Sequence, residues 1–405
     1  MNIAIVHNHP SGGAARAVYE LGRGLAQRHA IDVFTLSSAD ETFVRSADYA
    51  RSVRTLEYAA FRPVRFGLYL NDLRMYRDLV RLDDAYRQMA AAIDAGAYDV
   101  VLASACRVVQ SPGALRFVRT PAAYYCHEPP RRFIEPARRP DAGPLPLYRR
   151  LRSIWHRPAT RIMERALAER DHENVASACA VLTNSQFTAG LVREYYQRET
   201  EVCRLGVDVE RIAPGAQAGG YVLSVGAIDR HKGFGFLIDS LRLVPVAFRP
   251  PLVIAGNYAN EAVARELSAQ ADASGVQLTM RVRVTDAELR ALYANATAFI
   301  YAPEREPFGL AVLEAMAAGL PVVAVGEGGV LESVLPDETA VLVPRRADAL
   351  AAALERVLTD RALARSLGAE GRRVVEREWT WEAAARRIED ALERVAGRVP
   401  AGSTA

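Results

Sequence analysis

Short apolar, β-branched segments alternate with longer helical segments along the chain, and this alternation constrains the fold more than any other feature. Strands that alternate with helices in this way form parallel sheets with helices on both faces. In the first half, the predicted strands are residues 2–7, 31–36, 99–103, 122–126 and 178–183. We therefore predict a doubly wound, Rossmann-like α/β domain over residues 1–205.

The same alternation restarts at residue 221, after a stretch that contains Pro214 and several glycines and alanines. Such a composition is typical of a linker, so we expect a hinge at residues 206–220. Further strands are predicted at residues 221–226, 252–255, 276–284, 297–301, 321–325 and 340–343. These indicate a second Rossmann-like domain over 221–378, followed by a last helical segment at 379–405.

The composition of the 405 residues, with 50% hydrophobic and 24% charged residues, is that of a globular enzyme. No apolar run approaches the roughly 18 residues that span a membrane, and the N-terminus does not resemble a signal peptide. We expect a cytoplasmic protein. The four cysteines form no CxxC pair, which argues against a structural zinc site and against a redox dithiol.

The basic residues are unevenly distributed by type and by place. Lys232 is the one lysine among 51 basic residues, which singles it out at a site that needs a compact positive charge. Residues 131–170 hold 11 arginines against 4 acidic residues, interleaved with aromatic and aliphatic side chains. This segment, an excursion from the first domain, would suit contact with an anionic membrane at the inner face. A solvated helix or a patch that binds an acidic polysaccharide are the alternatives, and nothing else indicates nucleic-acid binding.

Ligands of open parallel sheets bind at the carboxyl ends of the strands, so the loops that follow strands deserve most weight. Gly12 and Gly13 follow the first strand and precede a helix, where free amides would attract an anion. A Gly-Gly pair alone is more often a simple turn, and no dinucleotide fingerprint is present. Lys232 and Gly233 follow the strand at 221–226 in a similar position, where the lysine could neutralise a phosphate.

The most informative stretch follows the strand at 297–301. Glu306 lies in the loop and Glu314 lies eight residues later on the next helix, roughly 12 Å away along its axis. This spacing is too long for a paired acid and base of the glycosidase type, which needs about 5–9.5 Å. Two separate carboxylates for the hydroxyls of a long polar ligand fit better. The amides of Phe308, Gly309 and Leu310 would hold an anion between them.

These motifs resemble those of the retaining glycosyltransferases of family 4, the "group 1" family with the two-domain GT-B fold. The resemblance covers nearly the whole chain and is most specific in the E-x7-E stretch from Glu306 to Glu314, which continues through Gly328, Gly329 and Glu332. The family pattern is also matched by Gly12-Gly13 with Arg16, by Lys232-Gly233 and by His127.

The resemblance implies transfer of a sugar from a UDP- or GDP-sugar to a carbohydrate or lipid-linked acceptor, with retention and without a metal or other cofactor. It implies two domains that face a cleft and a last helix that crosses back to the first domain. By analogy, the catalytic residues are His127, Glu306 and Lys232, with His127 and Glu306 at the sugar. The donor-binding residues implied are Gly12, Gly13, Arg16, Lys232, Phe308, Gly309, Leu310 and Glu314.

The chain departs from the family pattern at Ala227, where many relatives have an arginine that clamps the diphosphate together with the lysine. Arg230 or Arg305 could supply this second charge, or Lys232 could act with the backbone alone. Two other functions are compatible with the fold: a nucleotide-sugar epimerase, and a non-catalytic sugar-binding protein.

Overall fold

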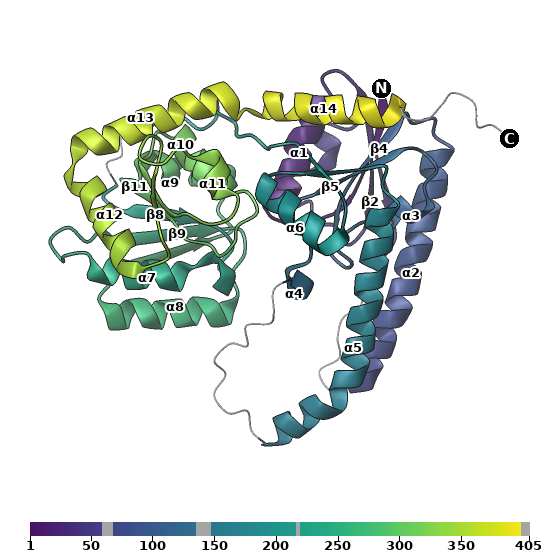
Figure 1. Ribbon diagram of the computed structural model, residues 1–405, viewed down its shortest axis with the longest axis horizontal. Coiled ribbons are helices and arrows are strands. Elements are labelled where there is room, and N and C mark those ends of the chain that lie inside the picture. The colour runs from purple at the N-terminus through teal and green to yellow at the C-terminus, as the bar shows by residue number, and fades with distance from the viewer. Residues whose placement is uncertain (59–67, 135–146, 216–218, 398–405) are drawn as a thin grey trace. The chain divides into compact units, whose positions relative to one another are not determined.

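The computed structural model describes residues 1–58, 68–134, 147–215 and 219–397; within these ranges, side chains are described except at 68–75 and 147–160. The described chain divides into two compact units, drawn in Figure 1. Unit 1 comprises Met1–Asn184, Thr188–Cys203 and residues from Ala385 onward, and unit 2 comprises Ser185–Phe187 and Arg204–Ala384.

Unit 1 is built on a seven-stranded parallel sheet with the order β3-β2-β1-β4-β5-β6-β7. Its strands are β1 (Asn2–Asn8), β2 (Ala30–Leu36), β3 (Ser52–Leu56), β4 (Val100–Cys106), β5 (Ala122–Cys126), β6 (Ala180–Thr183) and β7 (Glu201–Val202). The helices wholly or mostly in this unit are α1 (Gly13–Leu25), η1 (Ser46–Asp48), α2 (Leu68–Asp94), α3 (Ala114–Phe117), α4 (Arg131–Ile134), α5 (Leu147–Ala176), α6 (Gln186–Tyr196) and α14 (Trp381–Gly397).

Unit 2 is built on a six-stranded parallel sheet with the order β10-β9-β8-β11-β12-β13. Its strands are β8 (Val222–Val225), β9 (Leu252–Gly256), β10 (Leu278–Val282), β11 (Ala298–Tyr301), β12 (Val322–Val325) and β13 (Val341–Val343). Its helices are η2 (Arg230–Lys232), α7 (Phe234–Leu243), α8 (Glu261–Ser274), α9 (Asp286–Asn295), α10 (Leu310–Ala317), α11 (Val330–Ser333), α12 (Ala347–Thr359) and α13 (Arg361–Glu378). The predicted doubly wound architecture is confirmed in both units.

Both sheets are covered by helices on both faces, and their central strands are almost entirely buried. Within β1 and β5, for example, every residue from Ile3 to Asn8 and from Ala122 to Cys126 is buried. Continuous apolar strands of this kind cannot face water on either side, which explains why they form the middle of a parallel sheet. Each unit has its own hydrophobic core.

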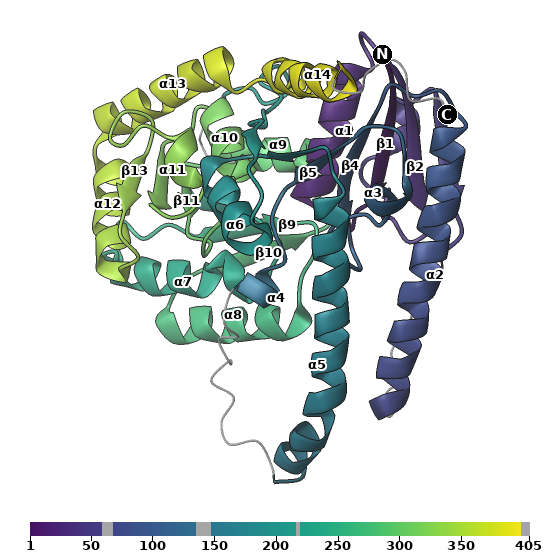
Figure 2. The same ribbon diagram turned by 45° about the vertical axis from the view of Figure 1, so that its right-hand side comes forward.

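The sequence prediction missed β3 and β7, which are the two outer strands of the unit 1 sheet. Each pairs with one neighbour only, and both are largely exposed or half-buried, so neither shows a continuous apolar run. The basic segment 131–170 holds α4 and most of α5, a helix of 30 residues that lies beside α2 (Figures 1 and 2). Residues 135–146 of that segment lie outside the described residues.

None of the described helices is both long enough and apolar enough to cross a bilayer.

Candidate functional site

In each sheet there is one point where the strand order reverses, and this point organises the predicted site residues. The reversal lies between β1 and β4 in unit 1, and between β8 and β11 in unit 2. Loops that leave the two central strands diverge there, which opens a space at the carboxyl ends of the strands where ligands of this architecture bind. Lys232 follows β8 and Glu306 follows β11, so the fold brings two distant segments to the switch point of unit 2.

Lys232 and Glu306 form a salt bridge at this point. The lysine Nζ donates to the Oε2 of Glu306 at 2.7 Å. Both side chains are mostly buried, with 18% and 15% of their areas exposed, respectively. Partial removal from water strengthens the attraction between the charges and fixes both side chains in place. The sequence predicted both residues, but not that they would touch.

Gly233 allows the Lys232 loop to approach the chain that follows β11. Its φ of 69° is left-handed, which favours glycine. A β-carbon at this position would lie 1.9 Å from the carbonyl oxygen of Ala302, a distance that no side chain tolerates. The Lys-Gly pair of the sequence therefore combines a charge with the one residue type that permits this backbone contact.

The backbone of the Glu306 loop packs against Gly328 and Gly329, which precede α11. The Gly329 amide donates to the Glu306 carbonyl at 2.8 Å. A β-carbon on Gly328 would lie 2.3 Å from that same carbonyl oxygen. The second Gly-Gly pair thus supports the backbone of the loop, and Glu332 is structural too, since its carboxylate accepts from the amides of Gln186 and Phe187 at 2.9 and 2.8 Å.

Arg345, at the end of β13, fixes the start of the same loop. Its guanidinium donates to the carbonyls of Ala302 and Pro303 at 3.0 and 2.7 Å and pairs with Glu327. One side chain that follows β13 therefore binds two carbonyls of the loop that follows β11, and this contact helps to fix the loop that carries Glu306.

Glu314 lies on α10, behind the loop, and has a partner of its own. The Tyr293 hydroxyl donates to Glu314 Oε2 at 2.8 Å, and both residues are buried. Glu306 instead accepts from Lys232, so the contacts described for the two glutamates come from different side chains. Gly309 caps α10 with φ 91° and no side chain caps that helix start, where Phe308, Gly309 and Leu310 were predicted to bind an anion.

The two arginines proposed to replace the missing cation at Ala227 have other partners. Arg230 forms an exposed ion pair with Glu266 at 2.6 Å. The Arg305 guanidinium carbon lies 5.9 Å from the centre of the Phe187 ring. The cation that the structure places against Glu306 at hydrogen-bond distance is Lys232.

In unit 1, Gly12 and Gly13 lie where α1 begins, directly after the loop that follows β1. Gly12 is the N-cap residue, and none of the described side chains caps this helix start. A β-carbon on Gly12 would have no atom within 4 Å, so the space beside it is open. Arg16 is half-buried in the first turn, and its amide donates to the Gly12 carbonyl. This arrangement suits the approach of an anion to the helix amides.

His127 directly follows β5 and belongs to a buried polar cluster that the sequence did not reveal. Its Nε2 lies 3.1 Å from Ser104 Oγ, and the Nε2 of His9 lies 3.0 Å from the same oxygen. Ser104 belongs to β4 and His9 follows β1, so the cluster lies at the switch point of unit 1. The sequence feature that could have indicated this cluster is a polar residue at or near the carboxyl end of each of the three strands β1, β4 and β5.

Burial keeps these imidazoles neutral. It lowers the pKa of His127 to about 3 and that of His7 to about 4, and it holds the pKa of His9 well below its ordinary value. The cause is the same in each ring, because a buried imidazolium loses its hydration. The unit 1 cluster therefore carries hydrogen bonds without charge.

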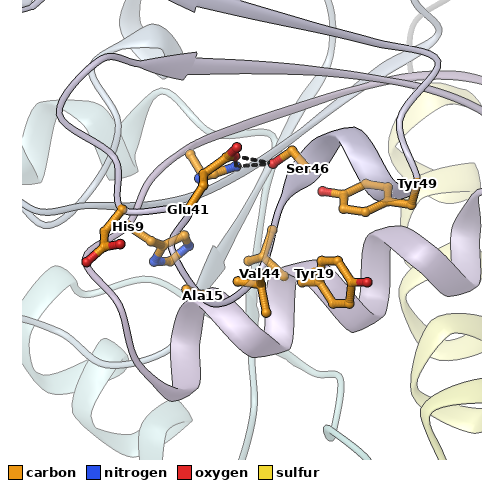
Figure 3. A pocket seen from close by; sticks show the side chains of 10 residues that line it. His9, Ala15, Tyr19, Glu41, Val44, Ser46 and Tyr49 are labelled. Carbon is orange, nitrogen blue, oxygen red and sulfur yellow. Dashed lines mark hydrogen bonds and ion pairs between the residues drawn. The ribbon is translucent and has the colours of Figure 1, made fainter. Parts of the chain in front are cut away.

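A small pocket adjoins this cluster, with a cavity volume of about 10 Å³, the room of about one water molecule. Figure 3 shows His9, Glu41 and Ser46 around it, with Tyr19 and Tyr49 farther along the wall. Ser46 donates to Glu41 at 2.6 Å and lies 3.1 Å from the Nε2 of His7. The Nδ1 atoms of His7 and His9 are buried and have no hydrogen-bond partner among the described side chains and backbone.

Comparison with known families gives a consistent result. A model described as "Glycosyltransferase Family 4" matches residues 11–211, and one described as "Glycosyl transferases group 1" matches residues 214–374. Together the two matches account for nearly all of the chain, one for each predicted domain.

Three individual proteins illustrate the similarity. The chain is 34% identical over 182 residues to a D-inositol 3-phosphate glycosyltransferase of Jonesia denitrificans, a match that covers 43% of either chain and so less than half of that relative. It is 24% identical to an alpha-1,3/1,6-mannosyltransferase of Neurospora crassa, over 96% of this chain and 90% of the relative. The structure of a sucrose-phosphate synthase from Thermosynechococcus elongatus superimposes with a TM-score of 0.77 and 22% identity, over 98% of this chain and all of that one.

Proposed function

Because the chain belongs to the group 1 glycosyltransferases, which have the GT-B fold, we propose that it transfers a sugar from a nucleotide diphosphate to an acceptor hydroxyl with retention of the anomeric configuration. The observation that carries this proposal is the Lys232–Glu306 pair at the switch point of unit 2. It sets a cation and a carboxylate side by side where the architecture binds ligands.

In this proposal, unit 2 holds the donor. Lys232 and the amides of residues 308–310 bind the diphosphate, and the carboxylate of Glu314 accepts from the ribose hydroxyls. The hydrogen bond from Tyr293 supports this role, because it orients the Glu314 carboxylate before any nucleotide binds. Glu306 contacts the transferred sugar, which is covalently attached to the phosphate that Lys232 binds.

The reaction breaks the bond between the anomeric carbon and the oxygen of the leaving diphosphate. The acceptor oxygen forms its bond to that carbon on the same face and gives up its proton, which the leaving phosphate or solvent takes. Lys232 stabilises the negative charge that develops on the diphosphate, and Glu306 faces the positive charge that develops on the sugar. The proposal assigns these roles to fixed protein charges and includes no metal ion.

Unit 1 would supply the remaining contacts. Gly12, Gly13 and Arg16 lie at a helix start that suits phosphate or sugar oxygens, and His127 follows β5 in the same unit, with its ring 5.6 Å from that of His9. The neutral imidazole can donate or accept a hydrogen bond but contributes no charge.

The test is nucleotide release from a set of UDP-, GDP- and ADP-sugars, each assayed with and without candidate acceptors. We expect release that depends on an acceptor, together with a product whose new linkage keeps the donor's anomeric configuration. Turnover of the nucleotide-sugar to its epimer without an acceptor would identify an epimerase. Tight binding without any turnover would identify a non-catalytic sugar-binding protein.

We also propose a cytoplasmic protein that acts on a lipid-linked acceptor in cell-surface glycan or glycolipid synthesis, in peripheral contact with the inner face of an anionic membrane. The support is the basic, aromatic character of residues 131–170 in the sequence, although most of its arginines lie outside the described side chains. Co-sedimentation with anionic and neutral vesicles at low and high salt tests the membrane contact. A preference for anionic vesicles that salt abolishes, and that is lost when Arg149, Arg150 and Arg152 become Glu, is the expected result; binding to neither vesicle would leave a soluble acceptor.

A further inference from the structure

Ser104 connects two imidazoles through a single hydroxyl group. Its oxygen lies 3.0 Å from the Nε2 of His9 and 3.1 Å from the Nε2 of His127, and the residue has no exposed surface. A hydroxyl has one proton to donate and can accept from a second donor. Since both rings are neutral, the simplest complete arrangement has Ser104 donating to one ring and accepting from the other.

The Nδ1 of His9 decides between the two directions. This atom is buried and has no hydrogen-bond partner among the described residues. If Ser104 donated to His9, the proton of that ring would be on Nδ1, as a buried N–H without an acceptor. If His9 donates through Nε2, then Nδ1 is an unpaired acceptor instead. Unpaired buried acceptors are less rare than unpaired buried N–H groups, which favours the second direction.

The neighbouring His7 also has one ring nitrogen near a serine hydroxyl, and here the direction of the hydrogen bond is fixed by a third group. The Ser46 hydroxyl donates its single proton to the Glu41 carboxylate, with 2.6 Å between Oγ and Oε1. The Ser46 oxygen must then accept from the Nε2–H of His7 at 3.1 Å. Within the part of the chain that the structure describes, the Nδ1 of His7 is then a buried acceptor without a donor, as inferred for His9.

We propose that His9 and Ser104 are positioning residues that hold His127 as the Nδ1–H tautomer, so that its Nδ1–H donates to an oxygen of the substrate. The hydrogen bonds then run from His9 Nε2–H to Ser104, and from the Ser104 hydroxyl to His127 Nε2. The tautomer follows from unit 1 alone, whereas the identity of the substrate oxygen as one of the transferred sugar rests on the proposed function.

This arrangement gives His127 one defined chemical role. A ring whose Nε2 lone pair is occupied by Ser104 has only a donor left for a ligand, so His127 recognises an oxygen and does not remove a proton. An asparagine at this position places its amide N–H near the Nδ1 position of the imidazole, whereas a glutamine places it near Nε2. His127→Asn should therefore retain more activity than His127→Gln, and the reverse order would overturn the assigned role.

The tautomer can be measured directly in the intact protein without any substrate. Long-range ¹⁵N–¹H spectra of histidine-labelled protein distinguish Nδ1–H from Nε2–H rings, and spectra of His127→Asn and His9→Gln assign the two signals. We expect Nδ1–H for His127 and Nε2–H for His9; the opposite pair overturns the proposal. Ser104→Ala should convert His127 into a mixture of tautomers, whereas Ser177→Ala, which removes a hydroxyl bonded to the Glu173 carbonyl, should change neither ring.

Kinetics provide the second measurement. Ser104→Ala should lower kcat about tenfold, the scale of one lost hydrogen bond, with little change in the KM of the nucleotide sugar. An unchanged kcat, with the His127 tautomer already mixed, would show that the tautomer has no positioning role. If the expected tautomers are found but no nucleotide sugar is turned over, the proposed function fails and the hydrogen-bond assignment stands.

Discussion

The switch points of the two units differ in the kind of interaction that holds their polar residues. In unit 2 the residues are charged, and Lys232 and Glu306 form an ion pair that is mostly buried. In unit 1 the corresponding position holds neutral imidazoles that are linked through Ser104. The same architecture therefore presents a charged surface in one unit and an uncharged hydrogen-bonding surface in the other.

This difference corresponds to two different tasks in the proposed reaction. A leaving diphosphate gains negative charge, so fixed charges and helix amides are the groups that stabilise it. A neutral hydroxyl of a sugar is recognised by hydrogen-bond donors and acceptors of defined direction. A buried charge at that place would carry a desolvation penalty and would not improve the recognition of the hydroxyl. We therefore expect substitutions in unit 2 to change rates most, and substitutions in unit 1 to change geometry and pH dependence.

The largest effect is expected at Lys232. Lys232→Ala removes the positive charge beside Glu306 and should lower kcat at least about a hundredfold, the scale of one preorganised stabilising group. Lys232→Arg should be impaired as well, because a planar guanidinium does not replace a compact ammonium in a site that is mostly enclosed. Steady-state rates with the best donor measure both.

The control for this prediction is Arg265→Ala. Arg265 is an exposed residue of the same unit and forms a surface pair with Glu261. Its loss should leave the rate within about twofold, because exposed pairs contribute little. Full activity of Lys232→Arg, or an equal loss in Arg265→Ala, would contradict the special role given to the single lysine.

The next effect is a pH dependence of stability that arises in unit 1. Below pH 6.5 the unfolded chain protonates His7, His9 and His127, while the folded chain, with lowered pKa values, does not. The free energy of unfolding is therefore highest above about pH 6.5. It falls as the pH decreases below that value, by up to about 1.4 kcal/mol per pH unit for each histidine. Burial raises the pKa of Asp171 to about 6, so this group works in the opposite direction between pH 6 and 4 and offsets one of the three.

Urea unfolding between pH 7 and 4.5, with hydrogen exchange of β1 and β4 amides to identify unit 1, measures this dependence. His127→Gln should reduce the slope of the unfolding free energy against pH by about one proton, since the glutamine does not titrate. A wild-type stability that is constant over this range would show that the imidazoles are not held neutral by folding.

The sequence also predicted the polar residues of unit 2 better than those of unit 1. Most strands of both sheets could be predicted, because apolar runs mark them, and Lys232, Glu306 and Glu314 could be singled out because they stand in recognisable local patterns. The outer strands β3 and β7 were missed because strands at the edge of a sheet need no continuous apolar run.

The unit 1 cluster was missed for a different physical reason. His9, Ser104 and His127 are separated by 95 and 23 residues, and each stands alone beside an apolar strand. They meet because β4 lies between β1 and β5 in the sheet, and the order of strands in a sheet cannot be read from any short stretch of sequence. The same holds for Tyr293, whose role depends on a contact across 21 residues to Glu314.

The smallest effect is expected from Tyr293→Phe, which removes the hydroxyl that orients Glu314. If Glu314 binds the ribose, the loss of one hydrogen bond to a charged group should raise the KM of the donor about tenfold and leave kcat nearly unchanged. Tyr221→Phe is the matched control, because its hydroxyl donates to the Leu292 carbonyl in the same unit. The sharper measurement compares a ribonucleotide with its 2′-deoxy analogue. Tyr293→Phe should narrow the difference in affinity between them, whereas an effect equal to that of Tyr221→Phe would mean that Tyr293 only stabilises the fold.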